Sequence, residues 1–293
     1  MERMIQTLLP EFQGWLENQE KSNATVSYYI KRAKMFAEDM GNMRANEITR
    51  EVLESWSKKL KSRASHNYTS TCLWAIYSFV KFLREEKGIE NRGFQEFRIQ
   101  NKKLPEYIDY LEGADLPRLL ESIDTSDVHG LRLRAYLELL LHTGLRPSEA
   151  LSLGRDIVHK TEIEVIGKGN KKRMVGLPPR ANHWLAKYID SREDSEASLF
   201  VTHCDAKEVS LRQMQDQFKK HVRKIGMDKT ILYWMRHTFA TNLLENGCPL
   251  PFIQFLLGHS KPETTQIYYI SVQKKNAIKA QMRYVENSYC GKS

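Results

Sequence analysis

Apolar residues recur at every third or fourth position through most of this chain, and that period is typical of helices with one buried face. In the first hundred residues the pattern predicts four helices, over residues 5–20, 25–40, 50–61 and 69–87. Gly88 follows the fourth helix and suits its C-terminus. We therefore expect an all-helical N-terminal unit.

The rest of the chain combines helical periodicity with one stretch of alternation. Residues 114–123 predict a short helix, and the strongly apolar stretch 131–142 predicts a buried one. Apolar and polar residues alternate over 162–166 and 173–177, on either side of a Gly-Asn turn, which predicts a β-hairpin with lysines at its tip. Helical periodicity returns near residue 211. The predicted fold class is mainly α with a small β-hairpin (α+β).

Between these parts, helical periodicity is lost over residues 89–105, a polar stretch that ends at Pro105. Such a stretch is typical of a linker between domains. We predict an N-terminal domain at 1–100, a linker at 101–108 and a C-terminal domain at 109–293 that ends in a helix.

The composition indicates a globular protein without a membrane span. Of 293 residues, 41% are hydrophobic, which is enough for a real core. The sequence shows no run of about 18 apolar residues, and its first residues lack the apolar core and cleavage site of a signal peptide. The four cysteines are scattered, which disfavours disulfides or structural zinc and fits a reducing cytoplasm.

A formal charge of +9 and a pI near 9.2 suit a polyanionic partner such as nucleic acid. Charge alone does not decide this, because many proteins are mildly basic. The lysines and arginines are clustered, and each cluster taken alone is more often a solvated helix face. The clusters lie at 31–34, 58–63, 168–173, 219–224 and 274–279.

Arg146 and Lys168 are the first candidates for chemistry. Arg146 lies in the stretch TGLRPSEALSL, between one helix and the next, which begins at Pro147. Its guanidinium can therefore point into a cleft, and Glu149 on the same helix face can orient it. Lys168 lies at the glycine-flanked hairpin tip GKGNKK. Each of these residues, taken alone, is more often an ordinary surface residue.

Two later stretches add further candidates. The stretch YWMRHTFATNLLENG begins a helix at Tyr233, and Arg236 follows on the same face. His259 lies in a break between two helices, within LLGHSKPETTQIYYI. Tyr268 and Tyr269 follow in the next helix, where either residue can simply belong to the core.

Two arginines, a lysine, a histidine and a tyrosine together suit phosphoryl transfer. Arginines bind phosphate in bidentate geometry and stabilise the charge of its transition state. A lysine can donate a proton to a leaving 5′-oxygen, and a tyrosine hydroxyl can attack phosphorus to form a covalent ester. A histidine can donate or accept a hydrogen bond at neutral pH. The sequence has no HExxH motif, acidic cluster or cysteine pair, so we expect no metal and no cofactor.

In their order and spacing, the stretches TGLRPSEALSL, VIGKGNKKRMVGLP, RHTFATNLLENG, LLGHS and TTQIYY resemble the motifs of the tyrosine recombinases, the phage-integrase-like family that includes the Xer-type resolvases. The resemblance covers nearly the whole chain. It implies a helical core-binding DNA-binding domain followed by a mostly helical catalytic domain. The implied catalytic residues are Arg146 and Arg236 as phosphate clamps, Lys168 as general acid, His259 beside the phosphate and Tyr268 as nucleophile. Tyr268 is preferred to Tyr269 because it directly follows TTQI, as in the family.

One position departs from the family pattern, which has H-x-x-R where this chain has Y-W-M-R at 233–236. A phenol, with an ordinary pKa of about 10, is a poor base at neutral pH but can hydrogen-bond a phosphate oxygen. We therefore expect Tyr233 to position the phosphate, and another group or water to take the proton of Tyr268. The resemblance also implies a supporting acid at Glu149 and a structural role for His237.

The implied function is site-specific DNA recombination through a 3′-phosphotyrosine intermediate, without metal or ATP, in Xer-like dimer resolution or in the integration and excision of a mobile element. The expected partner is a double-stranded recombination site, on which monomers assemble into a homo-tetramer. The candidate DNA contacts are Lys31, Arg32, Lys34, Lys58, Lys59, Lys171, Lys172 and Arg173. Two alternatives stay open: a DNA-binding relative with altered catalysis, and an unrelated helical transcription regulator.

Overall fold

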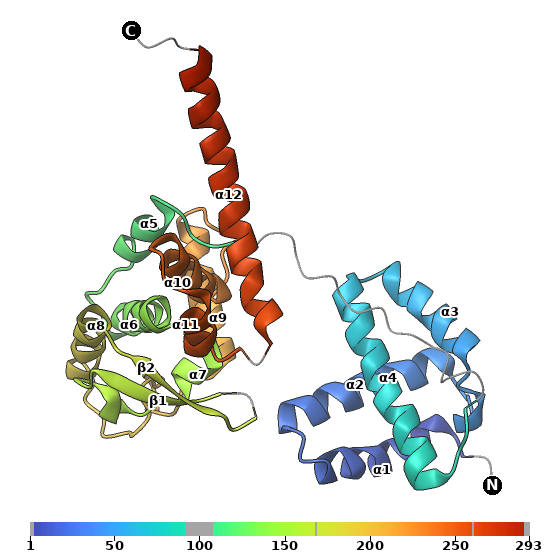
Figure 1. Cartoon of the computed structure of the whole chain (residues 1–293). Coiled ribbons are helices and arrows are strands. Elements are labelled where there is room, and N and C mark those ends of the chain that lie inside the picture. Colours follow the sequence, from blue (N-terminus) through green and yellow to red (C-terminus); the bar gives the residue numbers. More distant parts are fainter. Residues whose placement is uncertain (1–2, 92–107, 168, 260, 290–293) are drawn as a thin grey trace. The chain divides into compact units, whose positions relative to one another are not determined.

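The computed structural model describes residues 3–91, 108–167, 169–259 and 261–289, and the chain divides into two compact units, Met1–Leu104 and Pro105–Ser293 (Figure 1). The predicted fold class is confirmed, because the described chain is mainly helical with one sheet of two antiparallel strands. The predicted linker lies almost wholly outside the described residues, so the predicted domain boundaries stay predictions. Within the described ranges, no helix has both the length and the apolar character needed to cross a membrane.

The first unit packs its helices around an aromatic core. The ring of Phe36 meets Trp56 edge-on at 4.9 Å, and Phe12 meets Phe79 at 5.0 Å. Gly88, with a φ of 62°, ends the last helix in the left-handed conformation that glycine tolerates. The helices are α1 (Ile5–Asn18), α2 (Asn23–Met40), α3 (Arg50–Lys61) and α4 (His66–Lys87).

The second unit is built around α6, which is buried on almost every side. Leu137 and Leu140 have no exposed surface, and α8 and α10 pack against the helix (Figure 1). The long α12 continues beyond the other helices of this unit (Figure 1). The helices are α5 (Asp115–Glu121), α6 (Val128–Thr143), α7 (Pro147–Leu151), α8 (Pro179–Asp190), α9 (Leu211–Lys224), α10 (Tyr233–Glu245), α11 (Leu250–Leu257) and α12 (Pro262–Tyr289).

The predicted hairpin is formed by β1 (Glu162–Ile166) and β2 (Lys172–Gly176). Exposed and buried residues alternate along both strands, as expected for a sheet with one face on the core. Val165 pairs with Arg173, and both side chains lie on the buried face. The side chain of Arg173 therefore lies on the same buried face of the hairpin as apolar residues.

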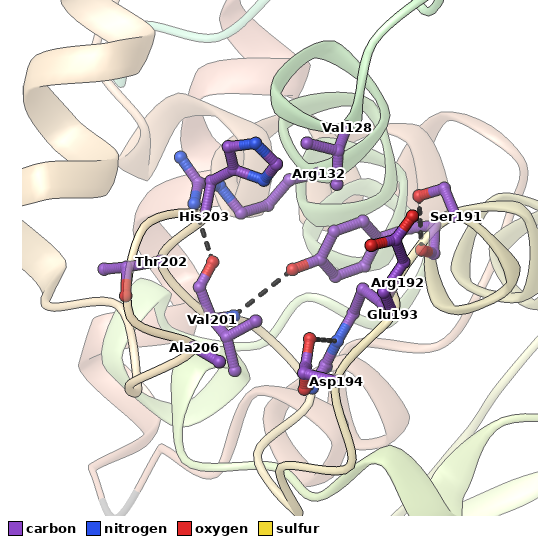
Figure 2. A pocket seen from close by; sticks show the side chains of 11 residues that line it. Val128, Arg132, Ser191, Arg192, Glu193, Asp194, Val201, Thr202, His203 and Ala206 are labelled. Carbon is purple, nitrogen blue, oxygen red and sulfur yellow. Dashed lines mark hydrogen bonds and ion pairs between the residues drawn. The ribbon is translucent and has the colours of Figure 1, made fainter.

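The loop that follows α8 is held to the core by polar side chains that surround a pocket of about 330 Å³ (Figure 2). Arg132 on α6 donates a hydrogen bond of 2.6 Å to the carbonyl of Val201, whose N–H donates to the hydroxyl of Tyr188 at 3.2 Å. Arg192 forms an ion pair with Asp194 (Figure 2). Because most of these groups bond one another, the pocket is a feature of loop anchoring.

Candidate active site

Arg236 is fully buried and is held between the C-terminal ends of two helices. Its Nη1 donates to the carbonyl of Gly144, just after α6, and its Nη2 donates to the carbonyl of Leu257 at the end of α11, each at 2.6 Å. Helix ends offer carbonyls without helical partners and the negative pole of the helix dipole, so they stabilise a buried cation. Burial, with the nearby charge of Arg146, lowers the pKa of Arg236 to about 10, so it stays charged at neutral pH.

Glu149 joins the arginines of the site. Its carboxylate accepts hydrogen bonds from Nη1 of Arg146 at 2.6 Å and from Nη2 of Arg173 at 2.7 Å, and it lies 4.0 Å from Nη1 of Arg236. It also accepts the backbone N–H of Arg146 at 2.9 Å, which fixes the start of α7. Burial alone would raise the pKa of Glu149, but the hydrogen bonds of Arg173 and Arg146 outweigh it and lower the pKa.

Tyr268 lies on α12 with its hydroxyl inside the same cluster. Only 3% of the residue is exposed, and its hydroxyl oxygen lies 2.8 Å from Nδ1 of His237. The ring of His259 stacks on the phenol at 6.3 Å. Burial raises the pKa of Tyr268 to about 12 against the opposing charge of Arg236, so the phenol is protonated at neutral pH. Tyr269, the alternative nucleophile, is 48% exposed.

The two histidines beside Tyr268 are neutral. Burial, with the charge of Arg236, lowers the pKa of His237 to about 4, and burial with the charges of Arg236 and Arg146 lowers that of His259 to about 3. Nδ1 of His259 lies 2.8 Å from the hydroxyl of the buried Thr265. Neutral imidazoles can each donate one proton and accept another, which suits them to a site of proton transfer.

Arg146 and His259 open onto a cleft of about 830 Å³ between the hairpin tip and α11. The tip contributes lysines 171 and 172, both exposed, so that the wall of the cleft is positively charged. Lys168 lies outside the described residues, although its neighbours Gly167 and Gly169 line this cleft. Such a cleft suits a polyanion.

Tyr233 lies at the rim of the site, at the start of α10. It is 38% exposed, and its ring meets His237 edge-on at 5.1 Å. Tyr233 is therefore part-exposed beside a buried histidine of the site.

Of the predicted site residues that are described, the structure gathers into one cluster Arg146, Glu149, Tyr233, Arg236, His237, His259 and Tyr268. The basic residues predicted to bind DNA are spread over both units. In the first unit Lys31, Lys34 and Lys58 are exposed. Lys59 pairs with Asp39, and the guanidinium of Arg32 lies over Tyr28 at 4.4 Å.

The structure gives two of the predicted residues contacts that the sequence did not indicate. Arg173, predicted among the DNA contacts, is 7% exposed and is directed at Glu149. His237, predicted to be structural, contacts the candidate nucleophile directly. The sequence contains one signal that His237 belongs to the site: it follows Tyr233 by one helical turn, so the two residues share a face of the helix.

Comparison with known proteins identifies the class. Residues 109–275 match the model of the phage integrase family. The chain is 30% identical over 273 residues to the tyrosine recombinase XerD of Lacticaseibacillus casei, covering 89% of this chain and 84% of the relative. It is 34% identical over 257 residues to XerD of Oceanobacillus iheyensis, covering 83% of each.

A solved structure supports the fold. The crystal structure of the XerH site-specific recombinase bound to a palindromic difH substrate aligns with a TM-score of 0.72 at 20% identity, over 89% of this chain and 80% of that one. The chain belongs to the phage integrase family. It is a tyrosine-type site-specific DNA recombinase.

Proposed function

We propose that Tyr268 cleaves DNA by attacking the phosphorus of one strand. The bond from Oη to phosphorus forms while the bond from phosphorus to the 5′-oxygen breaks, which leaves a 3′-phosphotyrosine and a free 5′-hydroxyl. Lys168 gives its proton to that leaving oxygen. The hydroxyl of a second duplex then reverses the attack, and because the ester conserves the bond energy, neither ATP nor a metal is needed.

Arg146 and Arg236 bind the scissile phosphate in this proposal. Nε of Arg236 has no hydrogen-bond partner among the described residues, so a donor is left over for a phosphate oxygen. Arg146 is part-exposed, with 26% of its side chain accessible at the mouth of the cleft. Tyr233 and His259 position the phosphate from either side. DNA binding has to expose Arg236 and Tyr268, because both are buried.

The observation that carries this proposal is the convergence of two arginines on one tyrosine. Arg146 and Arg236 meet at the carboxylate of Glu149, at 2.6 Å and 4.0 Å, and against the larger effect of burial the charge of each lowers the pKa of Tyr268 and so stabilises its anionic form. Groups that stabilise a phenolate also stabilise the negative charge that develops on an attacked phosphate.

Covalent trapping tests the proposal. The substrate is a duplex site that the full chain selects from a random-sequence DNA library, with a nick placed so that the 5′-hydroxyl fragment diffuses away after cleavage. We expect a protein–DNA adduct that resists denaturant, that forms equally well in EDTA and that is lost in Tyr268→Phe. Tyr269→Phe is the matched control and should keep the adduct. Persistence of the adduct in Tyr268→Phe would exclude this nucleophile.

We further propose that the enzyme acts in the cytoplasm, as a monomer that assembles into a homo-tetramer when two DNA sites are brought together. Four subunits supply one nucleophile for each of the four strands exchanged. The mass of the complex on the selected duplex, measured by light scattering with Tyr268→Phe, tests this stoichiometry. A complex that holds only two subunits on a single duplex at every protein concentration would contradict it.

A further inference from the structure

The proposed reaction requires a group that takes the proton of Tyr268. A phenol with a pKa near 12 holds its proton at neutral pH, yet the proton has to leave when the oxygen becomes an ester. The residue at the usual histidine position of the family motif is Tyr233, and a phenol is a weak base at neutral pH. The proton acceptor therefore has to be another group.

His237 meets the geometric requirement for that group. Its Nδ1 lies 2.8 Å from the hydroxyl oxygen of Tyr268, within the range for direct proton transfer. The two rings come from different helices, α10 and α12, and lie 5.5 Å apart. Tyr233 covers the imidazole edge-on, one turn earlier on α10, and so limits its rotation.

His259 is placed less well for the same task. Its Nδ1 is bound to the hydroxyl of Thr265 at 2.8 Å. Its ring lies parallel to the phenol, with only 15° between the two planes and 6.3 Å between the centroids. A stacked ring presents its face to the phenol, whereas the lone pair of an acceptor nitrogen lies in the ring plane. This geometry favours His259 as a phosphate contact.

We propose that His237 is a catalytic base, whose Nδ1 accepts the proton of Tyr268 as the bond from Oη to phosphorus forms, an inference that rests on the proposed function. The hydroxyl donates to Nδ1, so the imidazole carries its own proton on Nε2 before the step. It becomes an imidazolium when the ester forms. In the rejoining step it returns the same proton to the departing phenolate, while the attacking 5′-hydroxyl gives its proton to Lys168, so the cycle balances.

The charge state of the site agrees with this role. His237 is neutral at pH 7, because burial and the charge of Arg236 hold its pKa low, and it is therefore ready to accept. The attacking phenol becomes strongly acidic as its oxygen bonds to phosphorus, and a bound phosphate anion stabilises an imidazolium beside it. Among the described residues, the titratable or charged groups that face His237 are Tyr233 and Arg236 on α10, Tyr268 on α12 and His259 before α12.

His237→Gln and His237→Ala test the proposal on the nicked selected duplex. Glutamine keeps a hydrogen-bond acceptor but cannot take a proton. We expect adduct formation at pH 7 to slow by about 100-fold or more in both variants. Their rates should rise about tenfold per pH unit, following the phenolate fraction, whereas the unmodified chain should be nearly flat from pH 6 to pH 9. Imidazole in the buffer should partly rescue His237→Ala and not His237→Gln.

A merely structural role gives a different pattern. It would slow both variants without changing the pH profile and without rescue, and that result would overturn the proposal. The unmodified chain provides a test that needs no variant: a rate that climbs tenfold per pH unit over the same range would also overturn it. If Tyr268→Phe abolishes the adduct while His237→Gln cleaves normally, the base assignment fails and the nucleophile stands. If Tyr268→Phe still forms the adduct, the proposed function itself fails.

Discussion

The carboxylate of Glu149 and the guanidinium of Arg173 form a buried ion pair with two hydrogen bonds, of 2.7 Å and 3.2 Å. Each side chain is 6% exposed. Because the same carboxylate also accepts from Arg146, the hairpin arginine holds the acid that orients the proposed phosphate clamp. The pair links β2 to α7, and so holds the hairpin that lines the cleft against the helix that follows Arg146.

Arg173→Ala should destabilise the protein by about 3–5 kcal/mol, because removal of one partner leaves a buried charge without compensation. Urea unfolding followed by circular dichroism measures this loss. Lys172→Ala is the matched control: its ion pair with Glu164 is exposed, and its loss should cost less than about 1 kcal/mol. Equal losses in the two variants would show that Arg173 adds nothing beyond a surface charge.

The low pKa of Glu149 gives a dependence of stability on pH. A carboxyl group whose pKa is lower in the folded protein than its ordinary 4.5 stabilises the fold above that value, and the contribution is lost as pH falls through the folded pKa. Glu149→Gln removes this contribution. The difference in unfolding free energy between the unmodified chain and the variant should therefore shrink from pH 6 to pH 3. A constant difference would show that the carboxyl is not ionised in the fold.

The hydrophobic pattern predicted most helices because each of them buries one face. The stretch from 178 to 210 received no prediction, although α8 (Pro179–Asp190) begins there with a proline in its first turn and buries Leu185 and Tyr188. Its apolar residues recur at helical spacing, at Ala181, Trp184, Leu185, Tyr188 and Ile189, so the pattern does contain this helix. What local periodicity does not contain is the partner of its buried face, because the packing of this helix on α6 is a long-range contact.

The candidate site was predictable where a short motif carries a residue, as it does for Arg146, Arg236, His259 and Tyr268. Roles that arise from contacts between distant segments were not. Arg173 shares the inward face of β2 with Val175, so strict alternation would have placed it inside. A charged residue is normally assigned to the surface, however, and only the fold supplies the Glu149 that makes its burial favourable.

Arg146→Lys should slow cleavage of the nicked selected duplex by about 100-fold or more, which corresponds to about 3 kcal/mol of transition-state stabilisation. Lysine keeps the charge but not the planar pair of donors that binds both Glu149 and a phosphate oxygen. Affinity for the duplex, measured by fluorescence anisotropy, should change little because the net charge is unchanged. A parallel loss of affinity and rate would indicate a contact made mainly in the ground state.

DNA affinity should fall steeply with salt, since lysines and arginines displace counterions from the phosphates they neutralise. The logarithm of the binding constant should decrease linearly with the logarithm of salt concentration. Lys171→Ala and Lys172→Ala should each reduce the slope by about one, because both residues line the cleft. Lys207→Ala, at an exposed lysine paired with Asp205, is the control and should leave the slope unchanged. A flat response to salt would contradict a charged DNA-binding surface.

Tyr233→His should leave cleavage comparable or faster. Tyr233 is exposed at the rim, so histidine can replace it without creating a buried cavity, and it restores the residue that the family motif has there. An imidazole in this place can hydrogen-bond the phosphate as the phenol does and can also accept a proton at neutral pH. The rate of adduct formation measures the effect, and Tyr233→Phe, which lacks the hydroxyl, should be slower than the unmodified chain. Complete loss of activity in Tyr233→His would mean that the phenol has a specific task that imidazole cannot perform.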